Sequence, residues 1–333
     1  MSMPGLFDEI PERRLRLAAR LRELAGNNVW IGTSSWKYPG WLGNIYTPER
    51  YQTRGKFSQK KFDETCLAEY AETFSTVCGD FAFYQFPSRE YWAKLFLGSP
   101  TSLQFAFKVP EHITVKTWPR HARYGQRAGL DNENFLDAGL LEAAFTEPLG
   151  PHRARVSALI FEFGTFNKKE FPHAGEFVER LDSFLASLPR GWRYAVEIRN
   201  PEYLGPDYLD CLRRHGVAHV YSSWTRMPAL ESQLAFPSAQ TSDFTVVRAL
   251  LRPGRTYEQA VQTFSPYEKL KEPLESTREA LREIIRRGEQ NRKGVFVYVN
   301  NRLEGNAPAT IEAIVGRDEA ILGRDEAILG VDG

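Results

Sequence analysis

The stretch RVSALIFEF, residues 155–163, has the pattern of a β-strand that is buried on both faces. Side chains in a strand point alternately to its two faces. The face with Ala158 and Ile160 ends in an acid, Glu162, whereas the opposite face presents apolar residues through Phe163. We expect the second face to contact a layer of helices, and the first to line the interior of a barrel with Glu162 at its mouth.

Seven further stretches resemble this one, and helix-like segments separate most of them. Eight strands are the number that closes a parallel barrel, so we predict an α/β fold, a (β/α)8 TIM barrel. The Gly-rich loops G-x-G-x-x-G and G-x-x-x-x-G-K-[ST] are both missing, which argues against a doubly wound sheet and a nucleotide cofactor. The predicted strands are 29–34, 75–79, 103–109, 155–163, 193–198, 217–222, 244–250 and 294–300, and the predicted helices are 58–74, 89–96, 134–145, 174–188, 206–216 and 266–288.

The domain organisation follows from the same pattern. An amphipathic helix at about 11–24 falls in a segment, 1–28, that precedes the barrel of 29–315, and no Pro/Gly/Ser-rich linker divides that barrel. The stretches 111–133 and 253–265 are predicted to be long loops on the barrel rim. The remaining residues, 316–333, repeat GRDEAIL twice, and this tail is assigned no function.

Composition is that of an ordinary globular protein. Apolar residues make up 42% of the 333 residues, charged residues 26%, and the formal net charge is +1, so no global field attracts nucleic acid or anionic membranes. Three separated cysteines favour reduced thiols, and no apolar run is long enough for a signal or membrane segment. We therefore expect a cytoplasmic protein with a small-molecule substrate and no membrane partner.

The residues that could take part in catalysis or binding lie at the ends of the predicted strands. In barrels of this kind the active site lies at the carboxyl ends of the strands. Strand alternation turns five charged side chains from four strands toward that mouth, with Asp80 nearby after the second strand. Aromatic residues also follow the strand ends and suit a wall for a sugar ring or a planar substrate. The five charged residues are Lys108, Glu162, Glu197, Arg199 and Arg248.

Read together, these loops resemble the YecE-like family, domain of unknown function 72, a set of TIM-barrel proteins placed by analogy near sugar isomerases. The segments that carry the resemblance include IGTSSWKYPGW, FYQFPS, FAFKVPEHIT, VEIRNPEY and VYVNNRLEGNAP. The resemblance implies the barrel but supplies no reaction. The mouth that it implies is formed by Trp36, Tyr38, Tyr84, Lys108, Glu197, Arg199, Arg248, Asn300, Asn301 and Asn306.

The sequence also departs from the usual pattern of that family at several strand ends. Cys78 stands where a glutamate is common, Asp80 where an asparagine is, and Glu162 where the family has a glutamine. Gly164 falls in the same family run, while Asn200 and Arg302 each replace a histidine. These departures bear on the chemistry of the mouth rather than on the fold.

Several reactions remain open from the residues alone. Glu162 and Glu197 are the candidate acid and base, and as a pair they would also suit glycoside hydrolysis. With Asp80 they are candidate ligands for Mg²⁺ or Mn²⁺ in an isomerase-like or phosphodiesterase-like enzyme, although no metal site is assigned. Lys108, with Arg199 and Arg248, is predicted to position a phosphate or carboxylate rather than to act as a base.

The sequence thus predicts an enzyme that acts on a small polar, anionic or sugar-like substrate. Asn300, Asn301 and Asn306 would hydrogen-bond its hydroxyl or carbonyl groups. The alternative is a non-catalytic binding protein for an anionic or aromatic ligand or for single-stranded nucleic acid. The locally basic loop 116–129, with Trp118 and Tyr124, is the feature that favours the nucleic acid.

Overall fold

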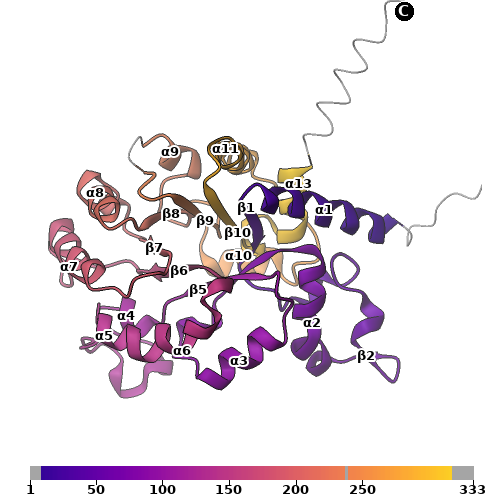
Figure 1. Ribbon diagram of the computed structural model, residues 1–333, viewed down its shortest axis with the longest axis horizontal. Helices are drawn as coiled ribbons and strands as arrows, with labels where there is room; N and C mark the ends of the chain where they lie inside the picture. Colours follow the sequence, from indigo (N-terminus) through magenta and orange to yellow (C-terminus); the bar gives the residue numbers. More distant parts are fainter. Residues whose placement is uncertain (1–8, 237–238, 317–333) are drawn as a thin grey trace, which may run out of the picture.

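The computed structural model describes residues 9–236 and 239–316, and its centre is a closed barrel of eight parallel strands. Helices surround the strands on all sides (Figure 1). The predicted fold is therefore confirmed, and all eight predicted strands form. The barrel strands, in their spatial order, are β1 (Val29–Thr33), β10 (Gly294–Val299), β9 (Phe244–Ala249), β8 (Ala218–Ser223), β7 (Tyr194–Glu197), β6 (Val156–Glu162), β5 (Gln104–Lys108) and β4 (Thr76–Gly79).

The helices alternate with these strands along the chain. A short antiparallel hairpin of β2 (Gln52–Thr53) and β3 (Lys56–Phe57) lies outside the barrel. The helices are α1 (Glu9–Gly26), α2 (Gln59–Thr73), α3 (Arg89–Leu97), α4 (Glu111–Thr114), α5 (Ala138–Leu141), α6 (Glu147–Leu149), α7 (Ala174–Ala186), α8 (Pro206–Arg214), α9 (Leu230–Leu234), α10 (Tyr257–Phe264), α11 (Glu275–Asn291), α12 (Asn301–Glu304) and α13 (Ala307–Val315).

Three stretches differ from the predicted secondary structure, and two of these differences have a local cause in the sequence. The stretch predicted as a rim loop at 253–265 contains α10, which begins with a capping box between Thr256 and Gln259. The helix predicted over 266–288 begins only at Glu275, because Pro273 cannot donate a backbone hydrogen bond and restricts the residue before it. The stretch predicted as one helix at 134–145 is divided between α5 and a π-helical turn.

Barrel closure depends on a close approach between the first strand and its neighbour β4. A Cβ atom on Gly32 would lie 1.9 Å from the backbone oxygen of Thr76, so only glycine fits there. The two strands then pair at Thr33 and Val77. Tyr70 of α2 stabilises this contact between β1 and β4, because its hydroxyl donates a hydrogen bond to the Thr76 backbone oxygen at 2.9 Å.

The barrel interior is filled by side chains that point inward from every second strand position. They are mostly small or branched, as in other packed barrel cores. The alternation predicted for four strands is confirmed. This interior layer consists of Cys78, Ala106, Ala158, Ile160, Ala195, Ala218, Val220, Phe244, Val246, Phe296 and Tyr298.

Candidate active site

Charged side chains follow directly above this apolar layer, at the carboxyl ends of the strands. Strand pairing sets Glu162 beside Glu197, and Ser222 beside Arg248. Three acids and three bases meet there in ion pairs, and we call them the mouth network. Its members are Asp80, Lys108, Glu162, Glu197, Arg199 and Arg248.

Glu162 lies at the centre of the mouth network, and three cations converge on one of its oxygens. Its Oε2 lies 2.5 Å from Nη1 of Arg248, 3.0 Å from Nη2 of Arg199 and 3.1 Å from Nζ of Lys108. Burial would raise the pKa of this carboxyl, but the three positive charges outweigh burial and hold the pKa well below its usual range. Glu162 is therefore ionised near neutral pH and cannot donate a proton as a general acid.

Glu197 lies deeper and has no exposed side-chain surface. Its Oε2 contacts Nη1 of Arg248, and its Oε1 accepts a hydrogen bond from the hydroxyl of Ser222 at 2.9 Å. Arg199 approaches the same Oε1 at 3.4 Å. Both carboxylate oxygens are thus engaged by the protein, which suits a residue that positions Arg248.

The two outer cations each rest on an aromatic ring. The Lys108 ammonium lies 3.8 Å from the centre of the Phe83 ring, and the Arg199 guanidinium lies 3.6 Å from that of Trp224. Cations in such positions are attracted by the negative face of the ring. The rings therefore fix both cations on the side of the network that is nearer to solvent.

Asp80 is the most exposed member of the mouth network. Its side chain is 38% exposed, compared with 13% or less for the five others. Its Oδ1 lies 3.5 Å from Nη2 of Arg248 and 3.9 Å from Nζ of Lys108. The Asp80 carboxylate is therefore the charged group of the mouth network that is most accessible from solvent.

The predicted aromatic residues are divided between packing and exposure. Trp36 is buried against the edge of Phe81, whereas Tyr84 is 51% exposed and lies under the Arg123 guanidinium. Burial raises the pKa of Tyr38 to about 12, with Arg302 acting in the opposite direction and Asp80 in the same one. Tyr38 therefore stays protonated at neutral pH and lies within electrostatic reach of Asp80.

The three predicted asparagines hold the loop that follows β10. The side chains of Asn300 and Asn306 accept backbone N–H groups at the starts of α12 and α13. The Asn301 oxygen accepts from Nε1 of Trp41 at 3.1 Å and from the Ala307 amide at 2.8 Å. All three side-chain oxygens thus have a structural use.

One contact of the site, Ser222, is not among the residues predicted from the sequence. It lies on the inward face of β8 with Ala218 and Val220, so strand alternation is the signal that identifies it. Asp80 is expected near the mouth from its position after β4, and the structure adds that it is the most exposed member of the mouth network.

Other reactive groups lie away from this network or are inert. Cys78 belongs to the apolar interior, and burial raises the pKa of its thiol to about 12, so it is not a nucleophile at neutral pH. Asp182 of α7, Cys211 of α8 and His215, the residue that follows α8, come together outside the barrel. The Arg214 guanidinium already lies 2.8 Å from the Asp182 oxygen that they share.

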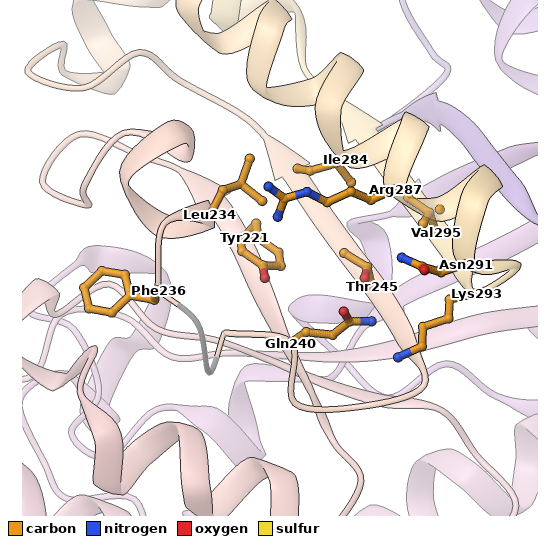
Figure 2. Close-up of a pocket in the computed structure, with 11 residues that line it drawn as sticks. Tyr221, Leu234, Phe236, Gln240, Thr245, Ile284, Arg287, Asn291, Lys293 and Val295 are labelled. Atoms are coloured by element: carbon orange, nitrogen blue, oxygen red, sulfur yellow. The ribbon is translucent and has the colours of Figure 1, made fainter.

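A separate cavity of about 140 Å³ lies outside the barrel wall, between its strands and α11 (Figure 2). Thr245 and Val295, which line it, are the second residues of β9 and β10. The cavity therefore lies toward the amino-terminal ends of these strands, away from the mouth network. Barrel enzymes place their catalytic groups at the opposite end.

Comparison with known proteins identifies relatives over most of the chain. The model of the family described as "Protein of unknown function DUF72" matches residues 30–320. The UPF0759 protein YecE of Escherichia coli K12 is 24% identical over 176 residues, which cover 53% of this chain and 50% of YecE. The protein of the same name from Escherichia coli O157:H7 gives the same values. The alignment spans about half the length of these curated relatives.

Solved structures show the same fold. A DUF72 family protein from Thermotoga maritima MSB8 has a TM-score of 0.57 at 22% identity, covering 87% of this chain and 99% of that one. One from Enterococcus faecalis V583 has a TM-score of 0.57 at 18% identity, covering 86% and 95%. At these identities the similarity supports the barrel and not a shared reaction. Within the residues that the structure describes, no helix is long and apolar enough to cross a membrane.

Proposed function

The chain belongs to the DUF72 family, and we propose that it is an enzyme acting on a small polar, sugar-like substrate at the carboxyl-terminal mouth of its barrel. The observation that supports this proposal is the mouth network itself. Removing five charges from water is costly, and barrel cores do not need it, because the layer beneath is apolar. Such clusters are more typical of active sites.

The geometry suggests a division of roles. Asp80, the carboxylate nearest to solvent, is the group placed to accept or donate a proton. Lys108, which lies 3.9 Å from Asp80, and Arg199, which lies 3.0 Å from Glu162, would donate hydrogen bonds to a hydroxyl or carbonyl oxygen of the substrate. In this proposal Glu162 and Glu197, the acid and base predicted from sequence, hold the three cations in place.

A metal-dependent mechanism is less compatible with these contacts. The carboxylate oxygens of Asp80, Glu162 and Glu197 face arginine and lysine nitrogens. A divalent cation at the same oxygens would be repelled by three positive charges within a few ångströms. We therefore propose proton transfer without Mg²⁺ or Mn²⁺.

The proposal is tested by solvent proton exchange. Neutral and phosphorylated aldoses and ketoses are incubated with the protein in D₂O, and deuterium incorporation is followed by proton NMR. We expect exchange into at least one neutral sugar, reduced by about 100-fold or more in Asp80→Asn. Glu176→Gln, which removes an exposed charge on α7, is the matched control and should exchange normally. Equal exchange by Asp80→Asn and the unmodified chain would refute the assigned role.

The alternative function is supported by the rim loop. Arg123 lies 4.2 Å from the centre of the exposed Tyr84 ring, and Arg127 lies 4.5 Å from that of Trp118, which is itself buried. Single-stranded nucleic acid binds to such surfaces by stacking and charge. A titration with oligonucleotides at increasing salt separates the two functions, because phosphate binding weakens steeply with salt.

A further inference from the structure

The point occupied by Oε2 of Glu162 has the character of an anion-binding site. Three cationic donors from three different strand ends lie within 3.1 Å of it: Lys108 at the end of β5, Arg199 after β7 and Arg248 on β9. Proteins usually bind carboxylates and phosphates with arginine guanidinium groups and lysine ammonium groups arranged around one oxygen. Here, however, the oxygen belongs to the chain itself.

The surrounding contacts keep the three cations in this arrangement independently of Glu162. Arg248 is also held by Glu197, which is completely buried. Arg199 lies on the Trp224 ring and Lys108 on the Phe83 ring. The cationic groups would therefore remain close together if the Glu162 carboxylate were removed.

The charges of the mouth network are balanced, since three acids face three bases. A ligand anion at the same point would have to displace Glu162 or lie against its negative charge. Like charges in a poorly solvated site repel each other strongly. A hydroxyl or carbonyl oxygen would meet no such repulsion.

We infer that Glu162 is an anion of the chain that fills an oxyanion site and restricts the mouth to substrates whose group next to that site is uncharged. The inference rests on the proposed function and specifies its substrate class, which is a neutral polyol or carbonyl compound rather than a sugar phosphate. Glu162 is thereby a specificity-determining residue. Its removal should convert the mouth into an anion-binding site.

The test is isothermal titration calorimetry, which measures the dissociation constants of inorganic phosphate and of formate. Glu162→Gln keeps the size of the side chain and removes its charge, and we expect it to bind phosphate at least 10-fold more tightly than the unmodified chain. Glu176→Gln changes the net charge equally at an exposed position and should show no gain. The double variant Lys108→Met/Glu162→Gln should lose most of the gain, which places the bound anion at the mouth.

A second measurement covers the case in which Glu162→Gln folds poorly. Glu162→Ala leaves room for formate, whose carboxylate replaces the missing group. We expect formate to raise the melting temperature of Glu162→Ala, and to do so more than that of the unmodified chain, because a ligand that binds only the folded state stabilises it. The absence of this difference would overturn the inference. So would phosphate binding that is equally tight with and without Glu162.

These experiments do not depend on turnover. Anion binding that appears only without Glu162, combined with no exchange into any sugar, would support the oxyanion site and refute the enzyme. Exchange into a sugar phosphate by the unmodified chain would support the enzyme and refute the inferred specificity.

Discussion

Two of the buried ionic regions in the described part of the chain differ in how completely their hydrogen bonds are satisfied. At the junction of α11 and α12, Glu304 accepts from Arg278 at 2.7 Å, from the Leu274 amide at 2.6 Å and from the Thr310 hydroxyl at 2.9 Å. This acid is completely buried and joins three chain segments. We call these contacts the Glu304 junction.

The mouth network is built from the same residue types but is less complete. The Nε atoms of Arg199 and Arg248 are buried and have no hydrogen-bond partner among the residues that the structure describes. Asp80 opens the mouth network to solvent. At the Glu304 junction Arg278 also approaches the exposed Glu275, at 3.6 Å, but the Glu304 carboxylate that accepts its hydrogen bonds is completely buried. The difference indicates that the junction serves the fold, whereas the mouth retains unused donors and exposed charge of the kind that a ligand would engage.

The largest effect on stability is expected at the Glu304 junction. Glu304→Ala leaves the Arg278 charge buried and removes the acceptor of the Leu274 amide, so we expect a loss of about 3–5 kcal/mol in the free energy of unfolding. Urea denaturation measures it. Glu312→Ala removes an acid whose partner Arg13 is 57% exposed, and should cost less than about 1 kcal/mol. Similar losses in both variants would contradict the role of the junction.

A smaller loss of stability is expected when the innermost arginine of the mouth is replaced. Arg248→Met leaves Glu197 buried, but Ser222 and Arg199 still contact it, so we expect a loss of about 2–3 kcal/mol. The double variant Glu197→Met/Arg248→Met removes both charges and should recover part of that loss. A double variant that is less stable than Arg248→Met by urea denaturation would show that the pair itself stabilises the fold.

Asp80→Asn should separate the two regions most sharply, because it should affect turnover and not stability. Asp80 is 38% exposed, and its nearest cation lies 3.5 Å away, so its loss should cost less than about 1 kcal/mol of unfolding free energy. We expect the sugar exchange rate to fall by about 100-fold. Urea denaturation beside the NMR exchange assay checks both, and a large loss of stability would assign Asp80 to the fold.

Acid should weaken the mouth through Glu162. The pKa of this carboxyl is lowered in the folded protein, so its contribution to stability is present above the unfolded pKa of about 4.3 and is lost as pH falls toward the folded value. The urea midpoint should therefore decrease between about pH 5 and 3, and decrease less in Glu162→Gln. If the urea midpoints of the unmodified chain and of Glu162→Gln fell equally with pH, protonation of Glu162 would be excluded as the cause.

The smallest effect is expected from metal removal. Three cations already contact the carboxylates of the mouth, so dialysis against EDTA should change neither the melting temperature nor sugar exchange. Elemental analysis of protein purified without a chelator gives an independent measure. Stoichiometric Mg²⁺ or Mn²⁺ that is lost in Glu162→Ala/Glu197→Ala would overturn the metal-free proposal.

The sequence was a good guide to the fold because strand patterning is local. The stretch 155–163 forms β6 at Val156–Glu162, and the inward positions predicted on β5, β6, β7 and β9 are confirmed. Sequence patterning was less successful where proline and capping govern a boundary, as at the start of α11 and throughout α10. The domain boundaries stay predictions, with segments 1–28, 29–315 and 316–333. The GRDEAIL tail lies outside the described residues from 317 onward.

The site residues stay predictions, and the structure shows which of them come together. Residues such as Lys108 and Arg248 were identified because alternation fixes the face on which they lie. Asn301 and Asn306 resembled ligand-binding amides, yet their oxygens cap a loop and a helix, because a side chain near a helix start satisfies backbone N–H groups first.

The sequence by itself determined the eight strands, the inward direction of their charged ends and the apolar layer below them, because each follows from the two-residue repeat of a single strand. Only the tertiary structure decided which charges meet. Strand register and barrel closure bring together residues that are far apart in the chain. They decide that three cations converge on Glu162, that Ser222 donates to Glu197 and that Asp80 is exposed.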